Sequence, residues 1–363
     1  MSIGKFPEFY VDVTKEATKI PQEQYHAVGR YPIIDQGQKS IAGMWDNPEG
    51  LYEKVPAIVF GDHTRVIKYV DTPFFIGADG VKVLRPADDG DNVKYLFYVL
   101  QAARIPNLGY SRHFKAVKEL EIRMYPRKKQ DEIVRVLEQV DSLIGQRQNE
   151  IMQIDQLVKS RFVEMFGDPV SNPKGWSVQN FEDISVLITD GEHATPRRSE
   201  RGIYLLSARN VLNHTLQLDD VDFIDEEEYC RIARRVTPQE GDVLISCSGS
   251  IGRCCVVPAN LRFQMVRSTA LIRFTEEINP IFAEWLITSE ELQHQIAQSA
   301  TQSSQANLFQ GKIQKLHGYV PPKELQDEFA AFVAEVDKSK LAVKQSLEKL
   351  ETLKKSLMQQ YFG

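Results

Sequence analysis

The sequence predicts an α+β protein in which two α/β globules are separated by two long antiparallel coiled-coil helices, with a pseudo-two-fold internal repeat. Three observations support this expectation. The same closing segment occurs twice without a gap, at residues 126–167 and, 196 positions later, at 322–363. Both copies carry a heptad-like apolar stripe, and each follows a stretch of short apolar runs in the same order. Duplication of one module, a globule followed by a helix, accounts for all three.

The repeat is visible as identical residues at matching positions. The motif Gln-Asp-Glu occurs at 130–132 and again at 326–328, and both segments end in Phe-Gly. A length of 363 residues also suits two domains better than one ordinary core. We therefore expect a first globule at 1–125, a spacer helix at 126–167, a second globule at 168–321 and a second spacer helix at 322–363.

The repeated segments are predicted to be long helices. Their apolar residues recur at spacings of three and four over several heptads, which is typical of a coiled coil. A proline lies near the start of each segment and a glycine ends it, as helix termini favour. At 1.5 Å per residue each helix would be roughly 60 Å long. The stripe consists of Ile133, Leu137, Val140, Ile144, Ile151, Ile154, Val158 and Met165, and of Phe329, Val333, Val336, Val343, Leu347, Leu350, Leu357 and Tyr361.

Polar residues and one glycine interrupt this stripe. Arg147, Arg161, Lys340 and Lys354 fall on it, either as solvated side chains or as partners of a facing helix. Gly145 should cost its helix about 1 kcal/mol relative to alanine, unless it marks a close backbone crossing. The sequence leaves both alternatives open.

The globules contain short apolar runs bounded by turn residues, which are typical of strands. A helical stretch follows these runs in each globule, at 95–103 and at 280–299. The runs lie at 31–34, 57–60, 66–70 and 81–84 in the first globule and at 203–207, 243–246, 254–257 and 269–274 in the second.

Composition bounds the class of protein. No apolar run approaches the ~20 residues that span a bilayer, and the first residues lack the layout of a secretory signal, so we expect a cytoplasmic protein with no membrane contact. The cysteines, Cys230, Cys247, Cys254 and Cys255, lack CxxC pairing, and buried free thiols are expected in the strand-like stretch. The net charge of −6 lacks the basic excess of a non-specific nucleic-acid binder. Acidic runs at 219–220 and 225–228 are expected to face away from any DNA.

The second globule contains an ordered set of short motifs. They are DGEHATP at 190–196, GIYLLSARNV at 202–211, GDVLIS at 241–246, SGSIG at 248–252 and QANL at 305–308. This set resembles the specificity subunit of type I restriction–modification systems, whose target-recognition domains carry the patterns DGtHxTP, GixfLxxxNI, GDil and GxiG. The first globule resembles another subclass of the same domain through GRYPIIDQGQ at 29–38 and IAG at 41–43.

The resemblance implies a function and partners. Each globule would be a target-recognition domain that reads one half of a bipartite, asymmetric site in double-stranded DNA, while the helices set the gap and dock the methyltransferase subunits. The implied partners are two modification (methyltransferase) subunits, which bind S-adenosylmethionine, and two restriction (motor–nuclease) subunits. Basic, amide and hydroxyl side chains read base edges and phosphates. Those expected to contact DNA are Asp35, Gln36, Gln38, Lys39, Arg65, Arg112, His113, Lys115, His193, Arg197, Arg198, Ser207, Arg209, Asn210, Ser248, Ser250, Arg253, Arg267, Gln305 and Asn307.

The sequence carries no recognisable catalytic constellation. Asp190, Glu192 and His193 lie within four residues, but turn formation explains an Asp-Gly pair better than a metal site does. The glycines of 248–252 come without the lysine of a P-loop, and the tetrapeptide at 279–282 lacks the second proline of the amino-methyltransferase motif. We therefore expect a non-catalytic chain without cofactor or metal.

Two alternative functions stay open. One is the recognition subunit of a related restriction system of another type, in which methylation and cleavage lie in one partner chain. The other is a coiled-coil scaffold that binds proteins instead of DNA. The acidic balance favours the scaffold, whereas the ordered motifs favour DNA recognition.

Overall fold

The computed structural model describes residues 2–77, 79–109, 111–300 and 307–363 and divides into two compact units. Unit 1 contains residues 1–149 and 344–363, and unit 2 contains residues 150–343. The two long helices are α4 (Arg127–Phe166) and α9 (Lys323–Phe362). Each unit is therefore a globule together with the first part of one long helix and the last part of the other.

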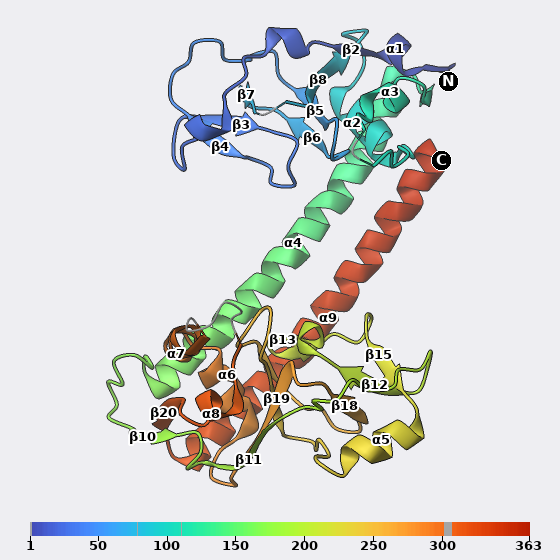
Figure 1. Cartoon of the computed structure of the whole chain (residues 1–363). Helices are drawn as coiled ribbons and strands as arrows, with labels where there is room; N and C mark the ends of the chain where they lie inside the picture. The colour runs from blue at the N-terminus through green and yellow to red at the C-terminus, as the bar shows by residue number, and fades with distance from the viewer. Residues whose placement is uncertain (1, 78, 110, 301–306) are drawn as a thin grey trace. The chain divides into compact units, whose positions relative to one another are not determined.

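Unit 1 is built on a four-stranded antiparallel sheet with strand order β2-β8-β5-β6. Helix α2 lies beside β5 and β6 and buries its apolar face there (Figure 1). A three-stranded sheet has the order β4-β3-β7, with β3 and β7 parallel, and β1 pairs with β9. The strands are β1 (Ser2–Lys5), β2 (Tyr10–Asp12), β3 (Tyr31–Ile34), β4 (Gly43–Trp45), β5 (Ala57–Gly61), β6 (Ile67–Val70), β7 (Phe75–Ile76), β8 (Val81–Pro86) and β9 (Glu121–Met124). The helices are α1 (Phe6–Phe9), α2 (Val93–Ala102) and α3 (Phe114–Val117), with 3-10 turns η1 (Thr14–Glu16) and η2 (Gln22–Gln24).

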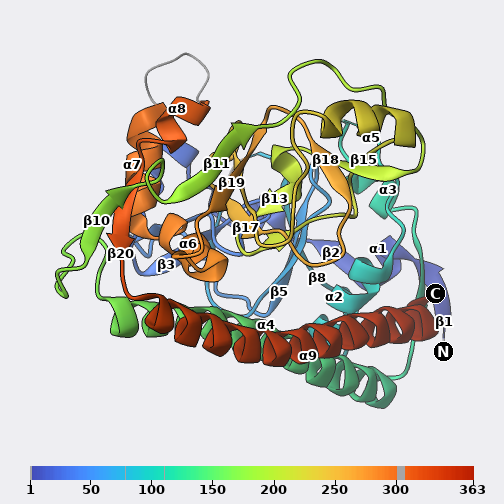
Figure 2. The same cartoon turned by 90° about the horizontal axis from the view of Figure 1, so that it is seen from below.

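Unit 2 repeats this framework. Its four-stranded sheet has the order β11-β19-β16-β17, with β11 and β19 side by side (Figure 2), and its three-stranded sheet has the order β15-β12-β18. The strands are β10 (Ser177–Asn180), β11 (Ser185–Asp190), β12 (Ile203–Leu206), β13 (Val211–Leu212), β14 (Thr215–Leu216), β15 (Asp222–Ile224), β16 (Val243–Ser246), β17 (Cys254–Val256), β18 (Phe263–Met265), β19 (Thr269–Phe274) and β20 (His317–Val320). The helices are α5 (Glu226–Ala233), α6 (Pro280–Ile287), α7 (Glu290–Ala300) and α8 (Gln310–Ile313), with the 3-10 turn η3 (Ala208–Asn210).

The matching topologies confirm the internal repeat and the α+β class. Strands β3 and β7 run parallel in unit 1, as β12 and β18 do in unit 2, and β10 pairs with β20 as β1 pairs with β9. Unit 2 adds the β13–β14 ribbon and helices α5 and α7. None of the helices in the described ranges is long and apolar enough to cross a membrane.

The single helical stretch expected at 280–299 is broken in two. Helix α6 ends at Ile287 and α7 begins at Glu290. The hydroxyl of Thr288 donates to the carbonyls of Glu284 and Trp285, both at 3.1 Å. Such side-chain bonds to the backbone compete with helix continuation, which explains the break.

The long helices contribute to the core of each unit. In unit 2, Phe162 and Phe166 of α4 pack against Phe282 of α6 and Phe329 of α9, with ring centroids 4.8–5.8 Å apart. In unit 1 the buried α4 residues include Ile133, Val134 and Leu137, and the α9 residues packed against that core are Leu357, Met358, Tyr361 and Phe362. The stripe residues near each globule are thus packed into its core, whereas middle positions such as Ile144, Ile151 and Val343 are half-buried.

Three of the polar residues on the stripe pair with the facing helix. Lys354 Nζ lies 2.7 Å from Asp141 Oδ1 in unit 1. In unit 2, Lys340 pairs with Asp155, and Arg161 Nη2 lies 3.2 Å from Glu328 Oε1. From Asp155 to Arg161 the residue number rises along α4, whereas that of the partner falls from Lys340 to Glu328 along α9. The helix segments within unit 2 are therefore antiparallel. The interpretation of these polar side chains as partners of a facing helix is therefore confirmed for all three.

Buried amides fix the start of each long helix to its globule. Gln130 of α4 is 1% exposed; its Oε1 accepts from the backbone N–H of Asn92 at 2.8 Å, and its Nε2 donates to the Tyr125 carbonyl at 2.8 Å. Asn92 caps the N-terminus of α2 and also donates to Asp131 Oδ1 at 2.7 Å. We call this arrangement the amide clamp of unit 1.

Unit 2 contains the same clamp. Gln326 of α9 is 0% exposed, and its Oε1 accepts from the backbone N–H of Asn279 at 2.8 Å. Its Nε2 donates to the Pro321 carbonyl at 2.8 Å. Asn279 caps α6 and donates to Asp327 Oδ1 at 2.7 Å. The repeated Gln-Asp pair of the sequence therefore marks a repeated hydrogen-bond network.

Replacing Gln326 with methionine, which keeps the volume and removes the hydrogen bonds, should lower the free energy of unfolding by about 2 kcal/mol or more. The cost arises because the Asn279 N–H and the Pro321 carbonyl stay buried without partners. Urea unfolding measures it, with Lys338→Met on the exposed side of the same helix as control, expected within ±0.5 kcal/mol. Equal midpoints for the two variants would show that the clamp contributes nothing.

Replacing Gly145 with alanine should raise the free energy of unfolding by up to about 1 kcal/mol. A Cβ built at Gly145 meets nothing within 4 Å, so the backbone makes no close crossing there. Urea unfolding of the variant tests this, and a clear loss of stability would mean that the glycine is needed for packing.

Candidate functional site

A hollow of about 500 Å³ in unit 2 brings together four of the predicted side chains. It lies at the ends of β11 and β16, beside the connection between β18 and β19 and the residues just before α8. The predicted residues on its wall are His193, Ser248, Arg267 and Asn307; Asp190, Cys247, Ser268, Leu308 and Phe309 complete it. Gln305 lies outside the described residues.

The Asp-Gly pair at the end of β11 shapes this hollow. A side chain at Gly191 would collide with the carbonyl oxygens of Met265 and Val266. Close contact lets Glu192 N–H donate to the Met265 carbonyl at 2.8 Å, and Arg267 N–H to the Glu192 carbonyl at 3.0 Å. The motif is therefore needed for the packing of two strand ends.

Asp190 is occupied by ion pairs. Its Oδ2 lies 2.7 Å from His193 Nε2, and its Oδ1 lies 2.6 Å from Arg235 Nη2. Arg235 also donates to the Gly191 carbonyl at 2.9 Å. Within the described part of the chain, no group of three or more His, Cys, Asp or Glu side chains is placed to hold a metal ion. The carboxylate of Asp190 is therefore held by ion pairs at the end of β11.

Arg267 and Phe309 differ from the other wall residues. The Arg267 side chain is exposed and forms no ion pair with any residue that the structure describes. Phe309 is 63% exposed, although Leu308 beside it is buried. The exposure of Phe309 could not be predicted from the sequence, because one phenylalanine before a short helix carries no signal of exposure.

The thiols near this hollow are inert. Burial raises the pKa of Cys247 to about 12, and Cys254 and Cys255 are buried with their pKa values also raised, chiefly by burial. The expectation of buried free thiols in this stretch is confirmed, while Cys230 on α5 is exposed.

Predicted arginines of unit 2 that do not line the hollow are paired with acids. Arg197 Nη2 lies 3.0 Å from Asp225 Oδ2, and Arg198 Nε lies 3.1 Å from Asp222 Oδ2. Arg209 Nη2 lies 3.3 Å from Asp222 Oδ1, and its side chain stays 48% exposed. The acidic runs at 219–220 and 225–228, which were expected to face away from any DNA, thus lie beside arginines that were predicted to contact it. Exposed pairs of this kind are weak, so the guanidinium groups stay available to a stronger anion.

Two predicted residues are buried inside loops. Asn210 is 1% exposed; its Oδ1 accepts from Ser207 N–H at 2.9 Å, and its Nδ2 donates to the carbonyls of Gln217 and Asp220. His113 is 1% exposed; its Nδ1 lies 2.8 Å from the Asp62 carbonyl, and its Nε2 accepts from Leu108 N–H at 3.0 Å. Both side chains have their hydrogen-bonding capacity used, so we assign them to holding their loops.

The β16–β17 hairpin carries Ser248 and two more predicted residues, Ser250 and Arg253. Ser248 is half-buried and Ser250 exposed, and the Ser246 hydroxyl donates to the Ser250 carbonyl at 2.6 Å. Arg253 is half-buried, with its backbone paired to Ser246. Ser207, on the loop of Asn210, is also half-buried. The expected hairpin turn is present.

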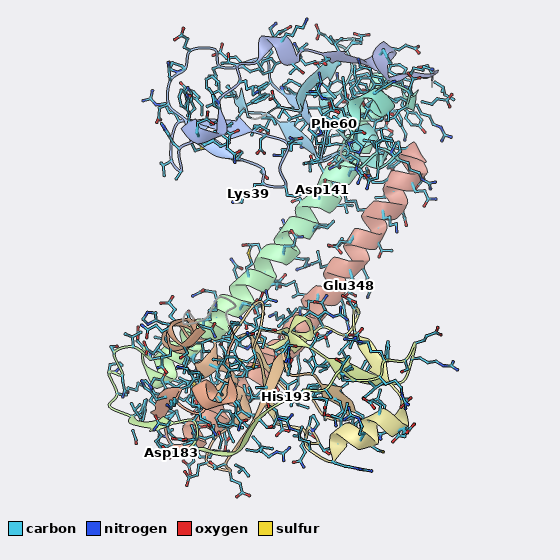
Figure 3. All side chains as sticks on the ribbon, viewed as in Figure 1. Lys39, Phe60, Asp141, Asp183, His193 and Glu348 are labelled. Atoms are coloured by element: carbon cyan, nitrogen blue, oxygen red, sulfur yellow. The ribbon has the colours of Figure 1, made fainter. Side chains whose placement is uncertain are left out.

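In unit 1 the loop after β3 carries four predicted residues. Asp35 Oδ1 accepts from Gly37 N–H at 2.8 Å, and Gln36 donates to the Asp79 carbonyl at 3.0 Å. Gln38 and Lys39 are exposed, and Figure 3 shows Lys39 on this loop. Asp35 and Gln36 thus brace a loop whose tip is exposed.

Arg112 and Lys115 are exposed near α3. A hydrogen bond and charge from Lys19 lower the pKa of Asp79, and the charge of Arg112 adds to this effect. Because Gln36 also contacts Asp79, the tip of the β3 loop and Arg112 belong to one surface. Arg65 lies elsewhere.

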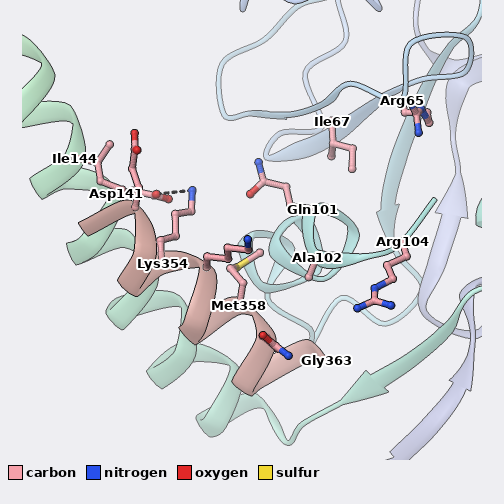
Figure 4. A pocket seen from close by; sticks show the side chains of 13 residues that line it. Arg65, Ile67, Gln101, Ala102, Arg104, Asp141, Ile144, Lys354, Met358 and Gly363 are labelled. Atoms are coloured by element: carbon pink, nitrogen blue, oxygen red, sulfur yellow. Dashed lines mark ion pairs between the residues drawn. The ribbon is translucent and has the colours of Figure 1, made fainter. Parts of the chain in front are cut away.

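Arg65 lines a separate hollow of about 760 Å³ in unit 1, between α2 and the helix segments (Figure 4). Its Nη1 donates to the Ile105 carbonyl at 3.2 Å. Asp141 on this wall pairs with Lys354 and accepts from the Tyr98 hydroxyl at 2.7 Å. The pKa of Tyr98 is raised, first by burial and then by this bond. This hollow belongs to the junction of helix and globule.

Comparisons with known proteins bear on this surface. Residues 11–153 match the family model described as the type I restriction modification DNA specificity domain. The specificity subunit of the type I restriction enzyme EcoR124I/EcoR124II from Escherichia coli is 31% identical over 94 residues, covering 25% of this chain and 23% of that protein. The match therefore spans about a quarter of that relative's length.

Two solved structures share the fold. The S subunit of a type I restriction-modification system from M. genitalium has a TM-score of 0.61 at 15% identity, covering 100% of this chain and 96% of that one. A chain from a structure of the type I R-M system has a TM-score of 0.53 at 14% identity, covering 99% and 97%. Because the sequence identity is this low, the two matches establish the fold alone.

Proposed function

Because residues 11–153 belong to the type I restriction modification DNA specificity domain family and the chain has the fold of type I specificity subunits, we propose that it recognises a DNA sequence for such a system. It would be the sequence-specific, double-stranded DNA-binding subunit. Each unit would read one half of a bipartite, asymmetric site. The chain would act in the cytoplasm, where its DNA lies.

One observation carries this proposal: a single framework is used twice with different polar surfaces. The strand orders and amide clamps match between the units. The surfaces differ, because unit 2 presents Arg267, Ser248 and Asn307 in a hollow, whereas unit 1 presents Gln38, Lys39 and Arg112 around a loop. Two equal frames with unequal surfaces suit two unequal half-sites.

The predicted residues divide by their surroundings into three proposed roles. Those that lie at the hollow, at its hairpin or at the loop tip would read base edges: Gln38, His193, Ser248, Ser250, Arg253, Arg267 and Asn307. Cations would hold phosphates: the exposed Lys39, Arg112, Lys115, Arg197, Arg198 and Arg209, and the half-buried Arg65. The bonded side chains would position their loops: Asp35, Gln36, His113, Ser207 and Asn210; Gln305 keeps its proposed role as a DNA contact.

The proposed division of labour assigns residues 1–125 and 168–321 to target recognition and residues 126–167 and 322–363 to spacing. Methyl transfer and cleavage would belong to two modification and two restriction subunits, and this chain would be non-catalytic. The polar residues on the helix stripe are used between the helices, so docking needs other positions. Exposed apolar side chains supply them: Leu143, Met152, Leu157 and Val163 on α4, and Leu341 and Leu353 on α9.

Lengthening both helices by one heptad, after Asn149 and after Val343, should increase the gap in the recognised site by about three base pairs, or abolish activity. Seven residues add roughly 10 Å to a helix. The measurement is methylation of a library with both half-sites and a randomised gap, using the chain with its modification subunits. Deleting one heptad from both helices should shorten the gap. A variant that recognises altered half-sites at the original gap would contradict the proposal.

Replacing Arg209 with alanine should weaken DNA binding by about 1–3 kcal/mol and relax specificity in the unit 2 half-site alone. The variant also leaves Asp220 without its ion-pair partner and Asp222 with Arg198 alone, which adds repulsion of phosphates. Fluorescence anisotropy with single-base variants of the site measures both effects, and Asp220→Asn should tighten binding. Equal loss at both half-sites would argue for a structural role, and circular dichroism detects unfolding.

A further inference from the structure

We propose that the unit 2 hollow reads two chemical groups of the DNA major groove, a guanine edge through Arg267 and a thymine C5-methyl group through Phe309. The inference rests on the proposed function and deepens it, because it names the atoms that one half-site must offer. It also gives a specificity role to Phe309, which no motif singles out. The two side chains lie on the wall of one hollow.

The side chain of Arg267 carries no ion pair in the described ranges, whereas most other arginines of unit 2 must exchange a carboxylate partner to bind DNA. Carboxylates hold Arg197, Arg198, Arg209, Arg231, Arg235, Arg262 and Arg273. Arg201, Arg234 and Arg253, like Arg267, form no ion pair in the described ranges, but none of them lines the hollow. Arg267 is therefore the cation that can enter a bidentate contact there without first breaking a pair.

The backbone around Arg267 is fixed. Its N–H donates to the Glu192 carbonyl at 3.0 Å, and Cys247 N–H donates to the Ser268 carbonyl at 2.8 Å. The Ser268 hydroxyl accepts from Ala208 N–H at 3.1 Å. A long side chain on a fixed base loses only its own rotamer freedom on binding, which favours a specific contact. Arginine bonds to O6 and N7 of guanine in this way.

The one carboxylate in the hollow does not compete for Arg267. Asp190 is held at 2.7 Å by His193 and at 2.6 Å by Arg235. Arg235 compensates its charge, and both of its oxygens are occupied. The hollow presents Arg267 as its uncompensated charge, which suits an electron-rich base edge.

Phe309 is also held on a fixed base. Leu308 N–H donates to the Cys247 carbonyl at 2.9 Å, and the Phe309 carbonyl accepts from Lys312 N–H at 2.8 Å as α8 begins. The ring is 63% exposed between these two anchors. An exposed phenylalanine alone means little. On the wall of the hollow that also holds Arg267 it supplies an apolar surface, and the thymine methyl is the apolar group that the major groove presents.

The test uses the chain with its modification subunits and the site found by methylome sequencing of the host. Duplexes carry single replacements: 7-deazaguanine removes N7 from one guanine, and uracil removes the methyl from one thymine. The wild type should lose affinity about fivefold or more at one guanine. At one thymine of the same half-site it should lose about fourfold, the equivalent of ~0.8 kcal/mol for one buried methyl group.

Each variant should become blind to one replacement. Arg267→Ala should bind the normal and 7-deazaguanine duplexes equally, and Phe309→Ala the thymine and uracil duplexes equally. Phe309→Leu, which keeps an apolar surface, should retain the preference for thymine. Arg234→Ala is the matched control, because this exposed, unpaired arginine lies outside the hollow. It should bind less tightly to every duplex with unchanged ratios.

The outcomes separate this inference from the proposed function. If the wild-type complex prefers no sequence at all, the proposed function fails. If it prefers its site, but both variants keep the wild-type ratios for all replacements, the function stands and this inference is wrong. Loss of one sensitivity without the other would overturn the role of the residue whose variant kept its ratios.

Discussion

A buried glutamine on each long helix determines how that helix leaves its own globule. Gln130 and Gln326 are buried, and each accepts a hydrogen bond from the backbone N–H of the asparagine that caps a globule helix. Each also donates to the backbone carbonyl of the residue two positions before its own long helix. An amide in an apolar core is costly unless it is fully bonded, so only one orientation of helix and cap is acceptable. Sheet, cap and helix are thereby joined into one rigid corner, which is present in both units. Any action that depends on the direction of the helices depends on this corner.

The strands and long helices could be predicted from the sequence, because local patterns determine them. Apolar runs placed the strands: 31–34, 243–246 and 269–274 agree with β3, β16 and β19. The repeated Gln-Asp pair indicated equivalence, although not the clamp behind it. Side-chain partners could not be predicted, because they depend on which loops meet in space. Asn210 and His113 have the composition of DNA contacts, yet their loops close over them. Arg197 and Arg209 looked free along the chain, yet α5 and the strand before it bring carboxylates to them.

These ion pairs account for an acidic protein with a proposed role on DNA. Where each exposed guanidinium is matched by a carboxylate, the field that attracts any phosphate backbone is weak. A duplex then gains most from donors without an ion pair in the described ranges, among them Arg267 in the hollow of unit 2 and Lys39 at the loop tip of unit 1. Weak general attraction combined with localised donors raises the ratio of specific to non-specific binding.

Unit 1 is assembled from both ends of the chain, whereas unit 2 is continuous in sequence. During vectorial synthesis, residues 150–343 are all available before the last helical turns leave the ribosome. The core of unit 1 must wait, because Leu357, Met358 and Tyr361 pack against it from the final segment. The nascent first globule therefore exposes an apolar face throughout translation, the kind of surface that chaperones bind. The contacts of unit 1 join residues 1–149 to residues 344–363, and contacts so distant in sequence form slowly. The unit that is synthesised first is therefore the one that completes its folding last.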